Sequence, residues 1–190
     1  MEVVELGIKL DKNLKYYDKL LKNYGLINDF KVETHDIYYT NQDLNGLSEN
    51  QMKNACIRLR SCNKSNYKIQ NSLDNINFAE KEISATKLSD FESRLVKLGY
   101  KKVFDTTKKD FHYYKTGMSS KIQLQQINDI GLLVYYDNSE YYNLEFEIQK
   151  KKLIDELNSC GFNFEYDILG LDKLRTLYYG KEMYSKNQNG

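Results

Sequence analysis

The sequence contains no proline and three cysteines, and none of its hydrophobic runs approaches the length of a membrane span. Cys56, Cys62 and Cys160 form neither a CxxC pair nor a Cys/His spacing typical of metal sites, so we expect reduced thiols in a cytoplasmic protein. The first residues open no signal peptide. The absence of proline accompanies many Lys, Asn, Tyr and Ile residues, a bias typical of AT-rich coding, and carries little structural information.

An excess of charge of one sign is also absent, because 28 Lys and Arg residues face 27 Asp and Glu residues. A formal charge of +1 gives no general attraction to nucleic acid or to a membrane, so neither is expected as a partner. Any anion site must therefore be local. The 190 residues are enough to bury a core, and we expect one domain over residues 1–180 followed by a disordered tail at 181–190.

Residues 54–61 alternate in side-chain character, which predicts a strand. Ala55, Ile57 and Leu59 fall on one face, and Arg58 and Arg60 fall on the other. Two residues apart on a strand, the guanidinium groups lie roughly 7 Å apart. This spacing suits a ligand with several anionic oxygens, because each planar fork can bind one phosphate or carboxylate. The alternative is a half-exposed strand whose arginines face water.

The two halves of the chain repeat the same order of elements. A helix over residues 14–24 ends at Gly25, and a second helix over residues 88–98 ends at Gly99, 74 positions later. At the same offset Phe30 matches Phe104, Asp36 matches Asp110 and Tyr39 matches Tyr113. Further strands are expected over residues 3–10, 30–40, 66–70, 76–84, 121–127 and 131–136. We also expect a loop over residues 41–53, a helix over residues 140–160 whose Leu144, Ile148 and Leu153 face the sheets, and a short helix over residues 172–179.

This order predicts an α+β protein in which two pseudo-repeated halves build a closed or nearly closed antiparallel barrel, with charges in the bore and helices outside. Cations and carboxylates together in a dry bore would be costly. They are explained if the cations bind phosphates and the carboxylates hold a divalent metal ion. The residues predicted to share the charged face are Glu5, Lys9, Arg58, Arg60, Lys68, Glu80, Glu82, Lys108, Gln123 and Gln125.

Over residues 2–180 these positions stand in an order that resembles the CYTH, or triphosphate tunnel metalloenzyme, family, and most of all its class IV adenylyl cyclase branch. The segments that carry the resemblance are VVELGIK (residues 3–9), THDIYY (34–39), IRLR (57–60), YK (67–68), AEKE (79–82), KKDFHY (108–113), and residues 167–179 as a closing helix. The family implies an eight-stranded tunnel that acts on ATP, thiamine triphosphate or inorganic tripolyphosphate with Mg²⁺ or Mn²⁺.

On this resemblance we assign roles to the charged residues. Lys9 is the candidate catalytic residue, as a phosphate contact or as a general base. Arg58, Arg60, Lys68 and Lys108 are the candidate substrate-binding residues, and Glu5, Glu80 and Glu82 the candidate metal ligands. The expected function is a class IV adenylyl cyclase-like or triphosphatase activity. The alternatives are a catalytically degraded binder of nucleotide or polyphosphate, and a barrel without an anion role. The oligomeric state stays open, with a homodimer among the alternatives.

The sequence departs from the family more often at acids than at cations. If Lys9 is the lysine of the first-strand motif, its second acid has become Gly7, and a register shifted by two places Val3 and Gly7 at the first acid and the lysine instead. Both registers keep Glu5 and Lys9 in the bore. Because fewer carboxylates bind a divalent ion more weakly, we expect a weak metal site. The other departures are Asp110 at an arginine position, Gln125 at an aspartate position, and Tyr135 and Asp137 near a terminal acid pair.

Overall fold

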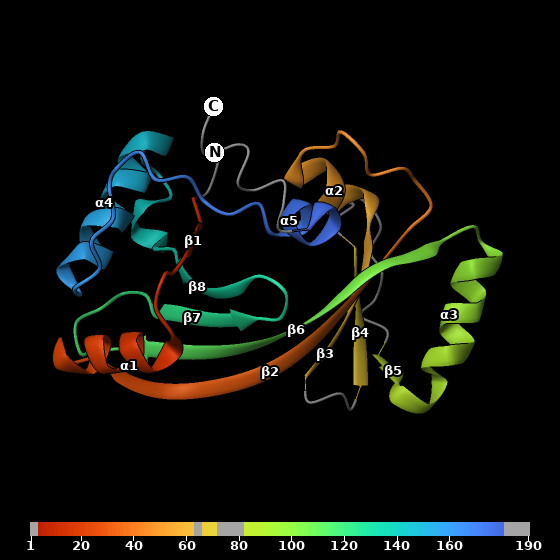
Figure 1. Cartoon of the computed structure of the whole chain (residues 1–190), viewed down its shortest axis with the longest axis horizontal. Helices are drawn as coiled ribbons and strands as arrows, with labels where there is room; N and C mark the ends of the chain where they lie inside the picture. The colour runs from red at the N-terminus through yellow and green to blue at the C-terminus, as the bar shows by residue number, and fades with distance from the viewer. Residues whose placement is uncertain (1–3, 63–65, 72–81, 181–190) are drawn as a thin grey trace. The chain divides into compact units, whose positions relative to one another are not determined.

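The computed structural model describes residues 4–62, 66–71 and 82–180, which form an α+β fold (Figure 1). Its strands are β1 (Leu6–Lys9), β2 (Ile27–Thr40), β3 (Ile57–Cys62), β4 (Asn66–Asn71), β5 (Glu82–Ser84), β6 (Lys101–Tyr114), β7 (Ile122–Ile127) and β8 (Gly131–Tyr136). Its α-helices are α1 (Leu14–Asn23), α2 (Glu49–Ala55), α3 (Leu88–Lys97), α4 (Phe146–Ser159) and α5 (Lys173–Tyr179). Two 3₁₀ turns, η1 (Ala85–Lys87) and η2 (Ser139–Tyr141), precede α3 and α4.

The strands form one sheet in the order β1-β8-β7-β6-β2-β3-β4-β5. The pairs β1–β8, β7–β8, β2–β3, β3–β4 and β4–β5 are antiparallel, which confirms an α+β fold with an antiparallel sheet. The predicted closed barrel is not confirmed, because β1 and β5 end the order among the described residues. The Gly7 carbonyl of β1 accepts a hydrogen bond from the Leu171 N–H (2.7 Å), so a loop residue occupies one pairing position of this end strand.

The chain forms two compact units. Unit 1 comprises Met1–Lys31, Lys109–Ile127 and Gly131–Leu171, and unit 2 comprises Val32–Lys108, Asn128–Ile130 and Asp172–Gly190. The long strands β2 and β6 contribute to both units, since each boundary falls within them. In unit 1, α1 and α4 cover one face of β1, β7 and β8. The core of this unit includes Ile8, Leu21, Leu124, Val134, Ile154 and Leu157.

The repeat predicted from the sequence is confirmed for the helix and the long strand of each half. Helix α1 covers residues 14–23 and α3 covers 88–97, while β2 covers 27–40 and β6 covers 101–114, so both pairs differ by 74 positions. Gly25 and Gly99 both adopt positive φ angles, 81° and 83°, directly after these helices. A residue without Cβ reaches this conformation at no steric cost, which explains why both helices end at glycine.

Unit 2 has hydrophobic clusters on both faces of its strands, because successive β2 residues point to opposite faces. On one face Ile37, Tyr39 and Leu59 pack with Leu95 of α3, and Ile57 packs beside them. On the other face Tyr38 packs with residues of α2 and α5 and of the segment before α2, namely Met52, Leu174 and Leu44. Figure 1 shows α2 and α5 side by side in this unit. The expected packing of Ile57 and Leu59 beneath a helix is confirmed.

Three of the expected elements need correction. The strand expected over residues 54–61 begins only at Ile57, because residues 54 and 55 belong to the last turn of α2 (Glu49–Ala55), so Ala55 does not lie on the strand face. The predicted loop over residues 41–53 contains the start of α2, which begins with a capping box: Ser48 accepts from the Gln51 N–H, and the Gln51 side chain accepts from the Ser48 N–H. The helix expected over residues 140–160 begins at Phe146, and its Ile148 is 45% exposed, whereas Leu153 is buried as predicted. The predicted tail at 181–190 lies outside the described residues.

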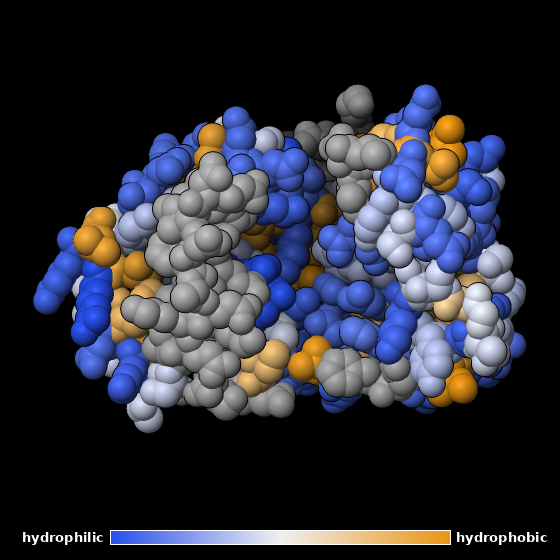
Figure 2. All heavy atoms as spheres, turned by 180° about the vertical axis from the view of Figure 1, so that it is seen from behind, coloured by the Kyte–Doolittle hydropathy of each residue, from blue (hydrophilic) through white to orange (hydrophobic). Residues whose placement is uncertain are grey.

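On the face that Figure 2 shows, apolar side chains of the described residues lie scattered among hydrophilic neighbours. Leu98 and Leu169 are the most exposed of the large hydrophobic residues, at 70% and 73%. Isolated apolar residues of this kind are normal on a folded protein. Across residues 4–62, 66–71 and 82–180, every helix is too short or too polar to cross a membrane.

We predict that Leu59→Ala destabilises the protein by about 2–5 kcal/mol, because Leu59 is fully buried beneath α3 and its removal leaves a cavity. The free energy of unfolding from urea titrations measures the effect. Val96→Ala, on the exposed side of α3, is the control and should change this free energy by less than about 0.5 kcal/mol. Equal effects of the two substitutions would contradict the packing of β3 against α3.

Candidate functional site: a cationic cluster in unit 2

The arginines of β3 lie on the face of unit 2 that is opposite α3. Arg60 pairs in register with Asp36 of β2, and Arg58 pairs in register with Tyr38. Residues directly opposite on paired strands share a face, so the four side chains form a patch of two rows. Tyr38 is buried and packs on Phe104 with ring centroids 4.7 Å apart. Burial raises the pKa of Tyr38 to about 12, so its hydroxyl stays protonated beside Arg58.

Asp36 holds Arg60 in a bidentate ion pair. The Arg60 Nε donates to Asp36 Oδ1 (2.7 Å) and Nη2 donates to Oδ2 (2.6 Å), while the Asp36 side chain is 1% exposed. Burial by itself would raise the pKa of Asp36, but the hydrogen bonds and the charge of Arg60 lower the pKa below its usual value. The carboxylate therefore stays ionised and fixes the orientation of the guanidinium group.

Two lysines complete a group of cations around Asp36. Lys108 of β6 is 8% exposed, and Lys173 begins α5. The pKa of Lys173 is lowered to about 8, first because the ammonium is desolvated, and further because the positive charges of Lys108, Arg60 and Arg58 oppose its own. Asp36 acts in the opposite direction and raises this pKa. We call Arg58, Arg60, Lys108 and Lys173 the cationic cluster.

The sequence analysis selected three members of the cationic cluster and missed Lys173. It predicted the helix that begins there and quoted Asp36 within a motif, but it assigned no role to either residue. A signal for Asp36 was present in the sequence, because it stands two residues before Tyr38 and so shares its face of the strand. Lys173 offered no such signal, because a lysine at the start of a short helix is ordinary in sequence and only the folded chain brings it to Asp36.

The predicted residues on β4 and β5 extend the same row by backbone register. Lys68 lies opposite Arg60, and Glu82 lies opposite Lys68. The row thus runs from Asp36 through Arg60 and Lys68 to Glu82, consistent with the predicted common face. The structure describes only the backbone at positions 68 and 82, and Glu80 lies outside the described residues. The roles of these three residues stay predictions.

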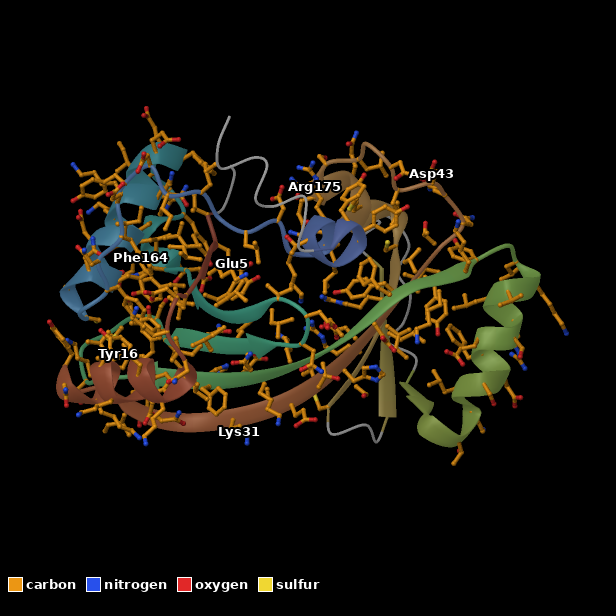
Figure 3. All side chains as sticks on the ribbon, in the orientation of Figure 1. Glu5, Tyr16, Lys31, Asp43, Phe164 and Arg175 are labelled. Carbon is orange, nitrogen blue, oxygen red and sulfur yellow. The ribbon has the colours of Figure 1, made fainter. Side chains whose placement is uncertain are left out.

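Glu5 and Lys9 belong to unit 1, where both are exposed. Glu5 lies in the segment that leads into β1 (Figure 3), and Lys9 is the last residue of that strand, opposite Leu133. Gln123 and Gln125 on β7 are joined by a hydrogen bond from Gln125 Nε2 to Gln123 Oε1 (3.3 Å). The roles predicted for Glu5 and Lys9 are not tested by this geometry.

Gly7 and Tyr135 form a close contact that links two of the departures from the family pattern. They lie opposite each other on β1 and β8. A Cβ atom added to Gly7 would lie 2.8 Å from Tyr135 Cε1, closer than real Cβ contacts. The tyrosine ring thus occupies the space that a side chain at position 7 would need. An acid at position 7 is incompatible with this placement of Tyr135.

The described residues do not by themselves complete the metal site that the family implies. Residues 4–62, 66–71 and 82–180 contain no group of three or more His, Cys, Asp or Glu side chains arranged to hold a metal ion. Around Gly7 and Tyr135 the neighbouring polar groups of β7 are the neutral carboxamides of Gln123 and Gln125, which attract a divalent ion less than carboxylates do.

We predict that Asp36→Asn lowers the free energy of unfolding at pH 7 by about 3–5 kcal/mol, because Arg60 loses its buried partner. The lowered pKa of Asp36 means that its carboxylate stabilises the fold above an unfolded-state pKa of about 3.9, and that this contribution is lost as the pH falls through the folded-state value. Urea titrations at pH 7 and at about pH 3 measure the free energy of unfolding of the wild type and the variant, and its change with pH. The exposed Asp90→Asn is the control, and a wild type no more sensitive to acid than Asp36→Asn would contradict the prediction.

No protein-family model and no curated protein matches the sequence. Among solved structures the chain is similar to the PH1012 protein of Pyrococcus horikoshii (TM-score 0.53, 19% identity, covering 88% of this chain and 96% of that chain). It is also similar to a putative adenylate cyclase from Vibrio parahaemolyticus (TM-score 0.50, 16% identity, covering 83% of this chain and 87% of that chain). A third similar structure is HpAC1 from Hippeastrum, described as a putative adenylyl cyclase with a dominant triphosphatase activity (TM-score 0.57, 13% identity, covering 95% of this chain and 97% of that chain). At these identities the likeness shows that the chain shares their fold, and its function must be argued from its own residues.

Proposed function

We propose that the cationic cluster of unit 2 binds the phosphate chain of a triphosphate, and that the protein is an enzyme acting on that triphosphate as an adenylyl cyclase or a triphosphatase. The observation that carries the proposal is the mutual repulsion within the cluster. Arg58, Arg60 and Lys108 all lower the pKa of Lys173, whose ammonium is already disfavoured by burial. Asp36 supplies one negative charge against the four positive charges of the cluster, so the local charge favours binding of an anionic ligand.

A triphosphate fits this arrangement better than an anion of single charge. Arg58 and Arg60 are two residues apart on one face of β3, about 7 Å along the strand, so their long side chains can converge on different phosphates of one chain. Asp36 orients Arg60 through two hydrogen bonds. An oriented cation needs less reorganisation to stabilise phosphate charge, which is the main contribution of proteins to phosphoryl transfer.

Both candidate reactions use the same bound phosphate chain. In a cyclase, the 3′-oxygen of the ribose attacks the α-phosphate and pyrophosphate leaves. In a triphosphatase, water attacks the γ-phosphate, the diphosphate is the leaving group, and the γ-phosphoryl group is released as orthophosphate. Neither reaction requires a covalent nucleophile on the protein, so positioning and charge neutralisation suffice. The shared fold with HpAC1, described as having a dominant triphosphatase activity, supports including hydrolysis beside cyclisation.

A second candidate function is binding of a nucleotide or polyphosphate without turnover. The observation that favours it is the contact between Gly7 and Tyr135, where an aromatic ring fills the place of a potential carboxylate. The metal ligands proposed from the sequence, Glu5, Glu80 and Glu82, decide between the two functions. If they hold Mg²⁺ or Mn²⁺ together with phosphate oxygens, turnover follows, since Mg²⁺ is commonly bound by one or two carboxylates plus substrate phosphates.

We predict that Lys108→Met weakens binding of tripolyphosphate more than tenfold, because removing one member of a desolvated charge pair costs about 2–5 kcal/mol. Isothermal titration calorimetry at constant ionic strength measures the dissociation constant. Lys101→Met, at the exposed start of the same strand, is the matched control and should bind like the wild type. If wild type and both variants fail to bind tripolyphosphate and ATP, the cationic cluster has no triphosphate ligand.

We further predict that triphosphate binding persists in excess chelator, while turnover is slow and requires Mg²⁺ or Mn²⁺. Glu80→Gln and Glu82→Gln should abolish turnover and retain binding, because a site with few carboxylates depends on each of them. Chromatography of cyclic AMP, pyrophosphate and orthophosphate measures turnover of ATP and tripolyphosphate, and calorimetry measures binding. Glu165→Gln, on an exposed residue of unit 1, is the control. Tight binding without any product would favour the second candidate function.

A further inference from the structure

Helix α5 is short, and its position depends on contacts with a distant part of the chain. With seven residues it is too short to be stable in isolation. Asp172, at its N-cap position, makes no side-chain capping hydrogen bond, and its carboxylate instead accepts from Arg175 Nη1 (3.1 Å). Some other group must therefore satisfy the first amides of the helix.

Glu49 of α2 supplies the missing cap. One Glu49 oxygen accepts from the Leu174 N–H (3.1 Å), and the other accepts from the N–H groups of Leu174 (3.0 Å) and Arg175 (3.1 Å). The amide of Leu174 directly follows Lys173, so the carboxylate holds the backbone at the residue that carries the ammonium. Figure 3 labels Arg175 on this helix.

The Glu49 carboxylate is mostly removed from water, since its side chain is 15% exposed. Burial raises the pKa of Glu49, the charge of Asp172 adds to this effect, and the two backbone amides and Lys53 oppose it. A carboxylate that is mostly removed from water needs hydrogen-bond partners, and the partners of Glu49 are the first amides of α5. These hydrogen bonds therefore orient the helix.

The far end of α5 has a separate attachment. The Tyr179 hydroxyl accepts from the Gly46 N–H (2.8 Å) and donates to the Leu44 carbonyl (3.3 Å). Between the two ends, Leu174 is buried among Tyr38 and Met52. These contacts hold the helix as a whole, whereas Glu49 acts at the turn that carries Lys173.

We propose that Glu49 is a positioning residue for Lys173: by capping the first turn of α5 it keeps the Lys173 ammonium beside Asp36 and the cations Arg58, Arg60 and Lys108. The consequence for ligand binding rests on the proposed function, whereas the placement of Lys173 does not. Without the cap, the first turn of α5 frays, and the ammonium moves from the cationic cluster into water.

The first experiment measures the pKa of Lys173 by NMR of selectively labelled lysine, with Lys173→Met to identify the resonance. In the wild type we expect a pKa lowered to about 8 by desolvation and the neighbouring cations. In Glu49→Ala it should rise toward the value of about 10.4 typical of a hydrated lysine. Glu49→Gln keeps one acceptor oxygen and should give an intermediate value, and it serves if Glu49→Ala does not fold. Tyr179→Phe removes two hydrogen bonds from the far end of α5 and should leave the Lys173 pKa unchanged.

The second experiment measures tripolyphosphate affinity in a double-mutant cycle. Lys173→Met and Glu49→Ala should each weaken binding, by about tenfold or more for Lys173→Met. The double variant should bind no more weakly than Lys173→Met, because Glu49 acts through Lys173.

A Lys173 pKa that stays near 8 in Glu49→Ala overturns the proposal. Additive losses of affinity overturn it too, since they assign Glu49 a role of its own. Failure of the wild type to bind any triphosphate overturns the proposed function alone, and the NMR measurement still decides the role of Glu49.

Discussion

The bidentate pair between Asp36 and Arg60 is the interaction on which the candidate site depends. It places an ionised carboxylate, 1% exposed, within a group of four cations. Asp36 also raises the pKa of Lys173, against the effects of burial and of the neighbouring cations. A single carboxylate thereby fixes the geometry of one arginine and keeps a buried lysine close to its charged state.

This arrangement requires different covers on the two faces of the unit 2 strands. On one face the apolar residues of β2 and β3 pack against α3, which gives the strands a rigid support. On the other face, α2 and α5 pack on Tyr38 and bring Lys173 to the arginines. The long side chains of Arg58 and Lys173 reach the same place from opposite layers because the helices lie over the strand that carries Asp36. The candidate site therefore lies between a sheet and a short helix. Glu49 caps the first turn of that helix, which carries Lys173.

The predicted metal site departs from the family pattern at Gly7 and Tyr135. Gly7 and Tyr135 are mutually adapted, since the ring occupies the space above the glycine. The missing acid on β1 and the aromatic residue on β8 look independent in the sequence. In the structure they are in contact, and each fits the other. An acid at position 7 would require the Tyr135 ring to move from its present place. The basic candidates Arg58, Arg60 and Lys108 are present in unit 2, whereas the first-strand acid is replaced by Gly7.

The sequence by itself determined the local elements and the parity of the arginine strand. Helical spacing followed by Gly25 and Gly99 gave two helices and two long strands 74 positions apart, and alternation separated Leu59 from Arg58 and Arg60. These features depend on residues close in the chain, whose pattern is visible without the fold. Helix α2 was within reach, because Ser48 and Gln51 form a capping box, but the polar composition of its segment favoured a loop. Only the tertiary structure brought Lys173 to Asp36, Glu49 to α5 and Tyr135 over Gly7, because contacts between residues more than a hundred positions apart leave no periodic signal in one sequence.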